Sequence, residues 1–190
     1  MNLSLIDNKN FEDQNYTVNK LPKAEYSYCT FTNCNFENSD ISNNSFLECE
    51  FIGCNISNVN VAHTTFNNVS FKSCKLVGVL FQNCNQFLLA FNFLDSTLNY
   101  ASFYQLKINK TRFYNCKMQN VDFTESEAKE LILTNCDLQN SIFEKTRLEF
   151  SDFSNAYNFT IDPSKNYLKN VIFSKENVLT LLTPFGIKII

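Results

Sequence analysis

The side chains that could carry out chemistry are few: one histidine, His63, and eight cysteines in 190 residues. Cys29 with Cys34, and Cys49 with Cys54, form two C-x4-C pairs, a pattern that superficially suggests thiolate metal ligands. His63 has no neighbouring catalytic constellation, and the sequence contains no phosphate loop, nucleotide fingerprint or zinc-type spacing. We therefore predict no catalytic residue, no cofactor and no metal site, and we expect that the protein is not an enzyme.

A repeat of five residues explains the cysteine spacing better than metal binding does. A bulky apolar residue recurs at every fifth position of residues 26–81, and the residue two positions earlier is small or compact, often cysteine. A period of five fits neither a helix nor a strand, so the chain must turn a corner after each repeat. The repeat therefore places paired cysteines on different faces of a solenoid.

The repeat is disturbed once and then resumes two residues out of phase, from Leu88 to Phe153. We predict a two-residue bulge within 82–87. If four repeats form one square coil, equivalent residues recur every 20 positions, or every 22 across the bulge. One interior column then reads Phe31, Phe51, Phe71, Phe93, Phe113, Leu133 and Phe153. A column this uniform favours the four-sided coil and a bulge of this size.

The repeats resemble those of pentapeptide-repeat proteins, with Cys, Ser or Thr often replacing the Ala of that family and Phe often replacing its Leu. The resemblance implies an all-β fold, a right-handed quadrilateral β-helix, over residues 26–158. We expect residues 1–25 to form an N-terminal capping coil, because end repeats of a solenoid are atypical. Residues 159–190 are expected to form an irregular last coil, a short capping helix and a dimerisation segment.

The C-terminal segment carries a helix pattern. Ser174 is a plausible N-cap for KENVLTLL, Pro184 and Gly186 should end the helix, and IKII should close the chain as a short strand. This segment is too apolar for a free end, so it is either a lid over the last coil or a lid that also dimerises. It resembles the closing segment of Qnr-type pentapeptide-repeat proteins, which implies a homodimer through Leu179, Leu182, Phe185, Ile187 and Ile189.

The Qnr-type resemblance also implies binding to DNA gyrase or topoisomerase IV, with protection from quinolones and imitation of DNA by acidic side chains. The candidate acidic surface is Asp122, Glu125, Glu144, Glu149 and Asp152. Read in columns of 20, however, most acids in residues 121–162 alternate with bases, which favours stabilising ion-pair ladders over a DNA-like surface. Asp122, Glu144 and Asp152 have no base in their own column. A structural scaffold with no topoisomerase role is therefore the alternative function.

The bulge offers a second candidate contact surface, formed by Phe87, Leu89 and Tyr104; it is either a partner-binding patch or a local repacking. The net charge of −3 gives no reason to expect direct nucleic-acid binding. The sequence has neither a signal pattern nor an apolar run of about 18 residues, so we expect a cytoplasmic protein with no membrane contact. Cysteines 20 residues apart could form disulfides by Cα distance alone, but buried thiols are expected in that reducing compartment.

Overall fold

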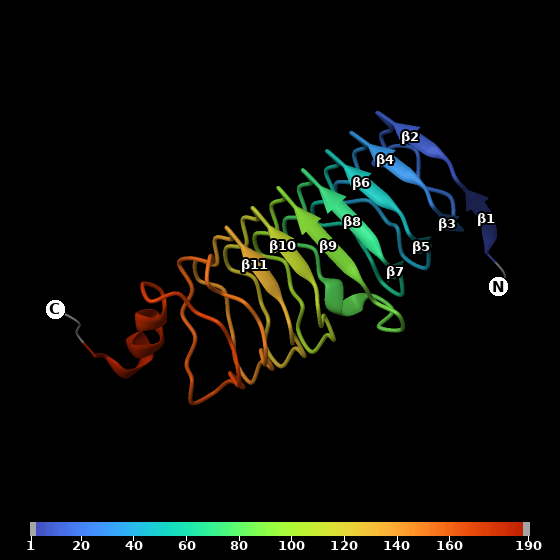
Figure 1. Cartoon of the computed structure of the whole chain (residues 1–190). Coiled ribbons are helices and arrows are strands. Elements are labelled where there is room, and N and C mark those ends of the chain that lie inside the picture. Colours follow the sequence, from blue (N-terminus) through green and yellow to red (C-terminus); the bar gives the residue numbers. More distant parts are fainter. Residues whose placement is uncertain (1–2, 188–190) are drawn as a thin grey trace.

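The computed structural model, which describes residues 3–187, is a tower of stacked coils with its two ends far apart (Figure 1). Successive coils align rung on rung, through parallel strands on two of the faces and single parallel bridges elsewhere. One face is a four-stranded sheet in the order β1-β3-β5-β7, and another is a seven-stranded sheet in the order β11-β10-β9-β8-β6-β4-β2. The predicted all-β coil is confirmed.

The strands are short because the chain turns after every repeat. The smaller sheet consists of β1 (Ser4–Asp7), β3 (Ala24–Ser27), β5 (Ser45–Leu47) and β7 (Thr65–Asn67). The larger sheet consists of β2 (Asn10–Glu12), β4 (Thr30–Thr32), β6 (Glu50–Ile52), β8 (Val69–Lys72), β9 (Phe91–Leu94), β10 (Arg112–Tyr114) and β11 (Ile132–Thr134). The other two faces are joined by single parallel bridges, such as Asn35 to Asn55 and Asp122 to Ile142.

The corners explain the abundance of asparagine. One residue in nearly every repeat has a left-handed backbone, for example Asn33 with φ 52° and Asn115 with φ 52°. Asparagine tolerates this conformation better than other residues that carry a Cβ, and glycine adopts it without strain. Gly53 and Gly78 occupy two such corners, with φ 65° and 69°.

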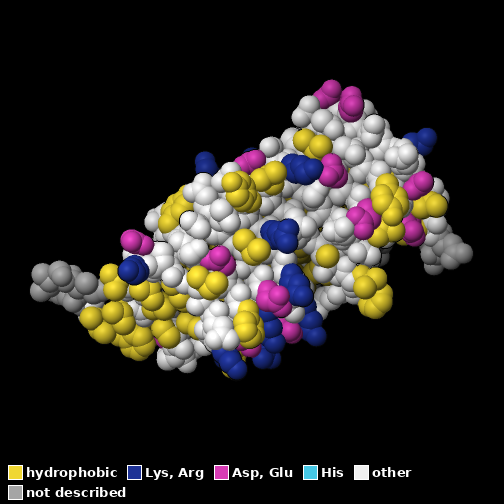
Figure 2. Space-filling model, viewed as in Figure 1, with side chains coloured by type: hydrophobic (Ala, Val, Ile, Leu, Met, Phe, Trp, Pro, Cys, Tyr) yellow, Lys and Arg dark blue, Asp and Glu magenta, His cyan; other side chains and the backbone are white. Residues whose placement is uncertain are grey.

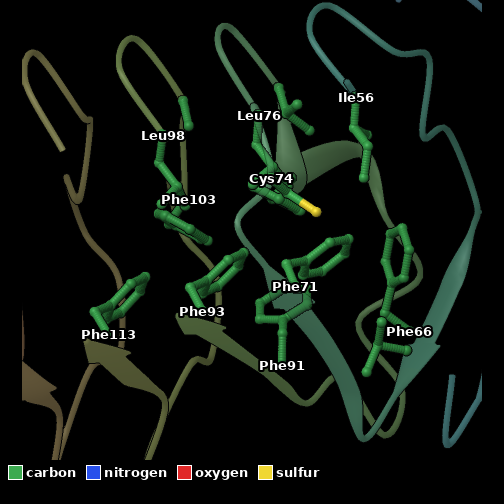
Figure 3. Packing of buried hydrophobic residues seen from close by; sticks show 14 of the residues in the cluster. Ile56, Phe66, Phe71, Cys74, Leu76, Phe91, Phe93, Leu98, Phe103 and Phe113 are labelled. Atoms are coloured by element: carbon green, nitrogen blue, oxygen red, sulfur yellow. The ribbon is translucent and has the colours of Figure 1, made fainter. Parts of the chain in front are cut away.

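Stacked phenylalanines form the interior, as the 20-residue columns predict (Figure 3). Phe31, Phe51, Phe71, Phe93 and Phe113 lie one above another, with successive ring centroids 4.8–5.2 Å apart. This spacing follows from the distance between neighbouring strands. A second stack of Phe81, Phe103, Phe123 and Phe143 has centroid spacings of 5.0–5.4 Å. The core is therefore a continuous aromatic column rather than a set of separate clusters.

The small interior position is often Cys, Ser or Thr because a hydrogen-bonding side chain has a partner there. The side chain donates to a backbone carbonyl 23 residues earlier, in the preceding coil. Examples are Cys54 Sγ to Phe31 O at 3.2 Å, Thr146 Oγ1 to Phe123 O at 2.8 Å and Ser151 Oγ to Ala128 O at 3.0 Å. Alanine would fill the same space but leave this bond unmade.

In the bulge, the structure buries a different side chain from the one that the repeat predicts. Asn85 keeps the 20-residue relation with Thr65, whereas Phe91 pairs with Val69 at 22 residues, so the register changes between Asn85 and Phe91. Leu88, assigned to the interior by the repeat, is 59% exposed and has φ 57°. Phe91, at a position that usually holds a small residue, is 2% exposed and fills the core instead. A short 3-10 helix, η1 (Phe81–Asn83), precedes this loop.

The C-terminal helix also departs in detail from its prediction. It is a 3-10 helix, η2 (Val178–Phe185), whose N-cap is Asn177, and Pro184 lies inside it rather than after it. Asn177 Nδ2 donates to Phe153 O at 2.7 Å, which fixes the start of the helix against the last coil. Gly186 ends the helix with a left-handed backbone. The predicted closing strand is wrong at Ile187, which is outside any strand, and its remaining residues lie outside the described range.

The first coil continues the sheets in register: β1 pairs with β3 and β2 pairs with β4. Its interior residues Ile6 and Phe11 are only partly buried, because no coil of the described chain lies beyond them. Within residues 3–187, no helix is long and apolar enough to cross a bilayer.

Candidate interaction surfaces

The groups that could do chemistry lie apart from one another. All eight cysteines are buried and unpaired, and burial raises the pKa of the Cys34 thiol to about 11 and that of Cys49 to about 12. A protonated thiol is a poor nucleophile and a poor metal ligand. No cluster of three His, Cys, Asp or Glu side chains able to hold a metal occurs between residues 3 and 187. His63 occupies an exposed corner with φ 59°.

Three of the five candidate acids are neutralised by cations. Glu125 lies 3.5 Å from the Lys145 ammonium, and Glu149 lies 2.9 Å from the Arg147 guanidinium. Glu144, which has no base in its own column, is nevertheless paired with Lys165 at 3.5 Å. Lys165 lies 21 residues later, in the irregular last coil, so the regular 20-residue column could not identify it.

The ladder prediction is confirmed for most pairs. Lys107–Glu127, Lys110–Glu130, Lys129–Glu149 and Lys145–Glu125 are all ion pairs of 3.5–3.9 Å. Lys117 and Asp137 are bridge neighbours, but Asp137 accepts from Gln119 at 2.6 Å and from Asn158 at 2.8 Å instead. Six cations and five glutamates make up the ion pairs from Lys107 to Lys165. This side of the tower is consequently not acidic, and Figure 2 shows charges of both signs intermixed along the lower side of the tower.

Asp122 and Asp152 take part in no ion pair among the described residues, but they do not form one surface. Each carboxylate accepts a hydrogen bond from a backbone N–H two residues later, Thr124 at 2.9 Å and Ser154 at 2.8 Å. Asp122 bridges to Ile142 and Asp152 bridges to Ile172, on different faces of the coil. The structure therefore does not bring the five candidate acids together as a continuous stripe.

Glu149 should make stability depend on pH. Burial raises the pKa of this carboxyl, but hydrogen bonds from its own N–H and from Arg147, with the charges of Arg147 and Lys129, outweigh burial and lower it. A lowered folded-state pKa means that this contribution is complete above the ordinary pKa and is lost as pH falls through the folded value. We expect the free energy of unfolding, measured with urea, to fall between pH 7 and pH 3. Glu149→Gln should show a shallower fall, and an identical pH profile in both proteins would contradict this role.

The bulge displays an apolar surface, although not through all the residues predicted for it. Phe87 is 71% exposed and Tyr104 is also exposed, whereas Leu89 is half-buried and packs against the core. Leu88 and Leu80 are also exposed, and Leu88 was missed because the repeat assigned it to the interior. We call Leu80, Phe87, Leu88 and Tyr104 the bulge patch.

The C-terminal end displays a second apolar surface. Leu179, Phe185 and Ile187 are exposed, whereas Leu182 is half-buried and Ile189 lies outside the described residues. Val178, which sequence reasoning did not select, is also exposed. Figure 2 shows hydrophobic side chains gathered at this end of the tower. Leu181, on the same helix, packs against the core, so one helix both covers the last coil and presents apolar side chains outward.

Comparisons with known proteins agree with this architecture. The chain matches the pattern of a pentapeptide repeat region over residues 24–103 and that of pentapeptide repeats over residues 132–160. No curated protein matches it in sequence.

Among solved structures, the chain is similar to QnrB1, described as a plasmid-mediated fluoroquinolone resistance protein. A trypsin-treated variant gives a TM-score of 0.64 at 15% identity, covering 100% of both chains. A second trypsin-treated variant gives 0.65 at 16% identity, covering 98% of this chain and 100% of that chain. Full-length QnrB1 gives 0.51 at 16% identity, covering 97% of this chain and 100% of that chain. Identities this low show a shared fold.

Proposed function

The chain belongs to the pentapeptide-repeat family. On that premise we propose that it is a non-enzymatic, cytoplasmic protein-binding module, which binds DNA gyrase or topoisomerase IV and protects it from quinolones. The observation that carries the proposal is the match in layout to QnrB1 along the whole chain. QnrB1 is described as a plasmid-mediated fluoroquinolone resistance protein, and the match to its trypsin-treated variant covers 100% of both chains.

Contact through the bulge patch fits the surface better than imitation of DNA. A DNA mimic needs a run of unpaired carboxylates, because phosphate-binding sites respond to the net negative charge that faces them. Glu125, Glu144 and Glu149 are each within 3.5 Å of a cation, which leaves Asp122 and Asp152 as the candidate acids with no ion pair in the described chain. Exposed aromatic and aliphatic side chains, by contrast, are typical anchors at protein interfaces.

A supercoiling assay with purified gyrase tests this function. Increasing amounts of the protein should progressively relieve inhibition by a quinolone. The double variant Phe87→Ser with Leu88→Ser should lose this relief, whereas Asp122→Asn with Asp152→Asn should keep it if the bulge patch makes the contact. The reverse pattern would point to mimicry. Absence of both relief and a complex at micromolar concentrations would overturn the proposal.

The proposal includes a homodimer formed through the C-terminal end. Support comes from the exposed side chains of Leu179, Phe185 and Ile187 on a segment that already covers the last coil. Apolar patches of this kind at a tower end suit a two-fold interface, in which the same surface meets itself. Light scattering should give twice the chain mass, and Leu179→Asp with Phe185→Asp should reduce it to the monomer mass. An unchanged mass in that variant would contradict this interface, and Phe87→Ser serves as the matched control.

A scaffold without a topoisomerase role is the alternative. The ion-pair ladders favour it, because alternating charges between coils stabilise the tower without offering a binding surface. The gyrase assay separates the two functions.

A further inference from the structure

The outer face of the seven-stranded sheet contains a shallow depression that none of the surfaces described above uses. It crosses β8, β9 and β10 as two adjoining hollows of about 260 Å³ and about 250 Å³. Both hollows are lined by Asn92 and Arg112, so they meet at these two side chains. The bulge patch and the C-terminal end contribute no residue to either hollow.

Side-chain length along one column creates the depression. The strand pairings align Glu50, Ser70, Asn92, Arg112 and Ile132 in successive coils. Ser70 and Asn92 are shorter than the glutamate before them and the arginine after them. Neighbouring strands are about 4.8 Å apart, so two short residues in succession leave a gap roughly two strands wide. Ala90, at the end of the bulge loop, lowers the rim of the first hollow in the same way.

The two hollows differ in chemistry. The first is lined by hydrogen-bonding and cationic groups, among them Asn68 and Lys110. The second is bounded by Leu94 and by the half-exposed ring of Tyr114, which are register partners on β9 and β10. No aspartate or glutamate lines either hollow. A ligand that spans both would carry an anionic group at one end and a flat apolar part at the other.

The cations at the polar end are available for such a ligand. Arg112 is exposed and has no carboxylate within 4 Å in residues 3–187, unlike Arg147, which holds Glu149 at 2.9 Å. The side chain of Lys110 is 73% exposed, and its ammonium lies as far as 3.8 Å from the Glu130 carboxylate. An anion could replace this long contact. Lys72, at the other end, is committed to Glu50 at 2.7 Å. A guanidinium binds phosphate and carboxylate through two parallel hydrogen bonds, which gives direction as well as charge.

We propose that this depression binds a small aromatic anion, with its phosphate or carboxylate held by Arg112 and Lys110 and its ring lying against Leu94 and Tyr114. Asn92, between the two hollows, is placed to hydrogen-bond the atom that joins the anionic group to the ring. The competing interpretation is a solvated surface arginine with no ligand, and it predicts no saturable binding.

Titration of the full chain, followed by NMR at low ionic strength, tests the proposal with phenyl phosphate, benzoate, inorganic phosphate and phenol. At least one of the first two probes should bind saturably and shift the resonances of Asn92, Arg112 and Tyr114. Comparison of phenyl phosphate with benzoate identifies which anionic group is preferred. Inorganic phosphate and phenol each offer half of the ligand. Each should bind more weakly than the preferred aromatic anion, by about tenfold or more. Equal binding of inorganic phosphate and phenyl phosphate would overturn the role of the apolar hollow.

Variants at the site complete the test. Arg112→Gln should weaken binding of the preferred probe by about tenfold or more, because it removes a charge-assisted, bidentate contact. Lys117→Gln, an exposed cation of the same coil on the next face, is the matched control and should leave binding unchanged. Thermal unfolding of both variants confirms that the tower is intact. No saturable shift with either aromatic anion, or equal binding by wild type and Arg112→Gln, would overturn the proposal.

Discussion

Replacement of Phe91 by alanine is expected to lower the free energy of unfolding by about 3–5 kcal/mol. This is a large effect for such a position. In the other repeats, the equivalent position, two residues before the bulky residue, usually holds a small side chain. The Phe91 ring is 2% exposed and lies between the Phe66, Phe81 and Phe93 rings, with centroid distances of 6.0, 5.1 and 5.5 Å. Removing it leaves a void that Leu88 cannot fill without reversing the left-handed backbone of the loop.

Val69→Ala is the matched control, because Val69 is the register partner of Phe91 in the preceding coil. It occupies the same kind of position and is fully buried, so its truncation should lower the free energy of unfolding by only about 1–2 kcal/mol. Urea unfolding monitored by circular dichroism measures both. If Phe91→Ala costs no more than Val69→Ala, the loop has re-formed with Leu88 inside and the position behaves as the simple repeat predicts.

The regular part of the tower could be predicted from the sequence because its repeat is exact over many coils. Each interior column needs the same residue type every 20 positions, so Phe31, Phe51 and Phe71 identify one another without knowledge of the fold. The same arithmetic identified ion pairs such as Lys145 with Glu125, because parallel in-register strands place residues 20 apart side by side.

The irregular parts could not be predicted in the same way. In the bulge, Leu88 and Phe91 are both apolar, and the choice between them depends on which side chain fills the space beside Phe66. In the last coil, the spacing from Glu144 to Lys165 is 21, so column arithmetic missed that pair. The depression beside Arg112 could not be predicted from charge and hydrophobicity, because it depends on side-chain length along the Glu50 to Arg112 column.

Substitution of Asn44 should have the second large effect on the free energy of unfolding. The five-residue repeat alone gives no reason to expect this effect. It lies at a small interior position, two residues before Phe46, and is 1% exposed. Its Oδ1 accepts from the Ala24 N–H at 2.9 Å, and its Nδ2 donates to Ile41 O at 3.1 Å. Asn166 likewise accepts from the Thr146 N–H at 2.9 Å, but its Nδ2 donates to Phe143 O of the preceding coil at 3.0 Å. An asparagine at this position thus links two coils through buried backbone groups.

Asn44→Ala should lower the free energy of unfolding by about 1–3 kcal/mol, because it leaves the Ala24 N–H without this partner inside the core. Asn44→Asp should be more damaging at pH 7, since a buried carboxylate would face the Ile41 carbonyl in place of a donor. Burial next to a carbonyl raises the folded-state pKa of the new acid above its ordinary value of about 3.9. Its folded state therefore binds the proton more tightly than the unfolded chain, so the variant should gain stability relative to wild type as pH falls from 7.5 to 5. Urea unfolding at both pH values measures this gain. If the difference in free energy of unfolding between variant and wild type does not change with pH, the introduced carboxyl is solvated rather than held between the two coils.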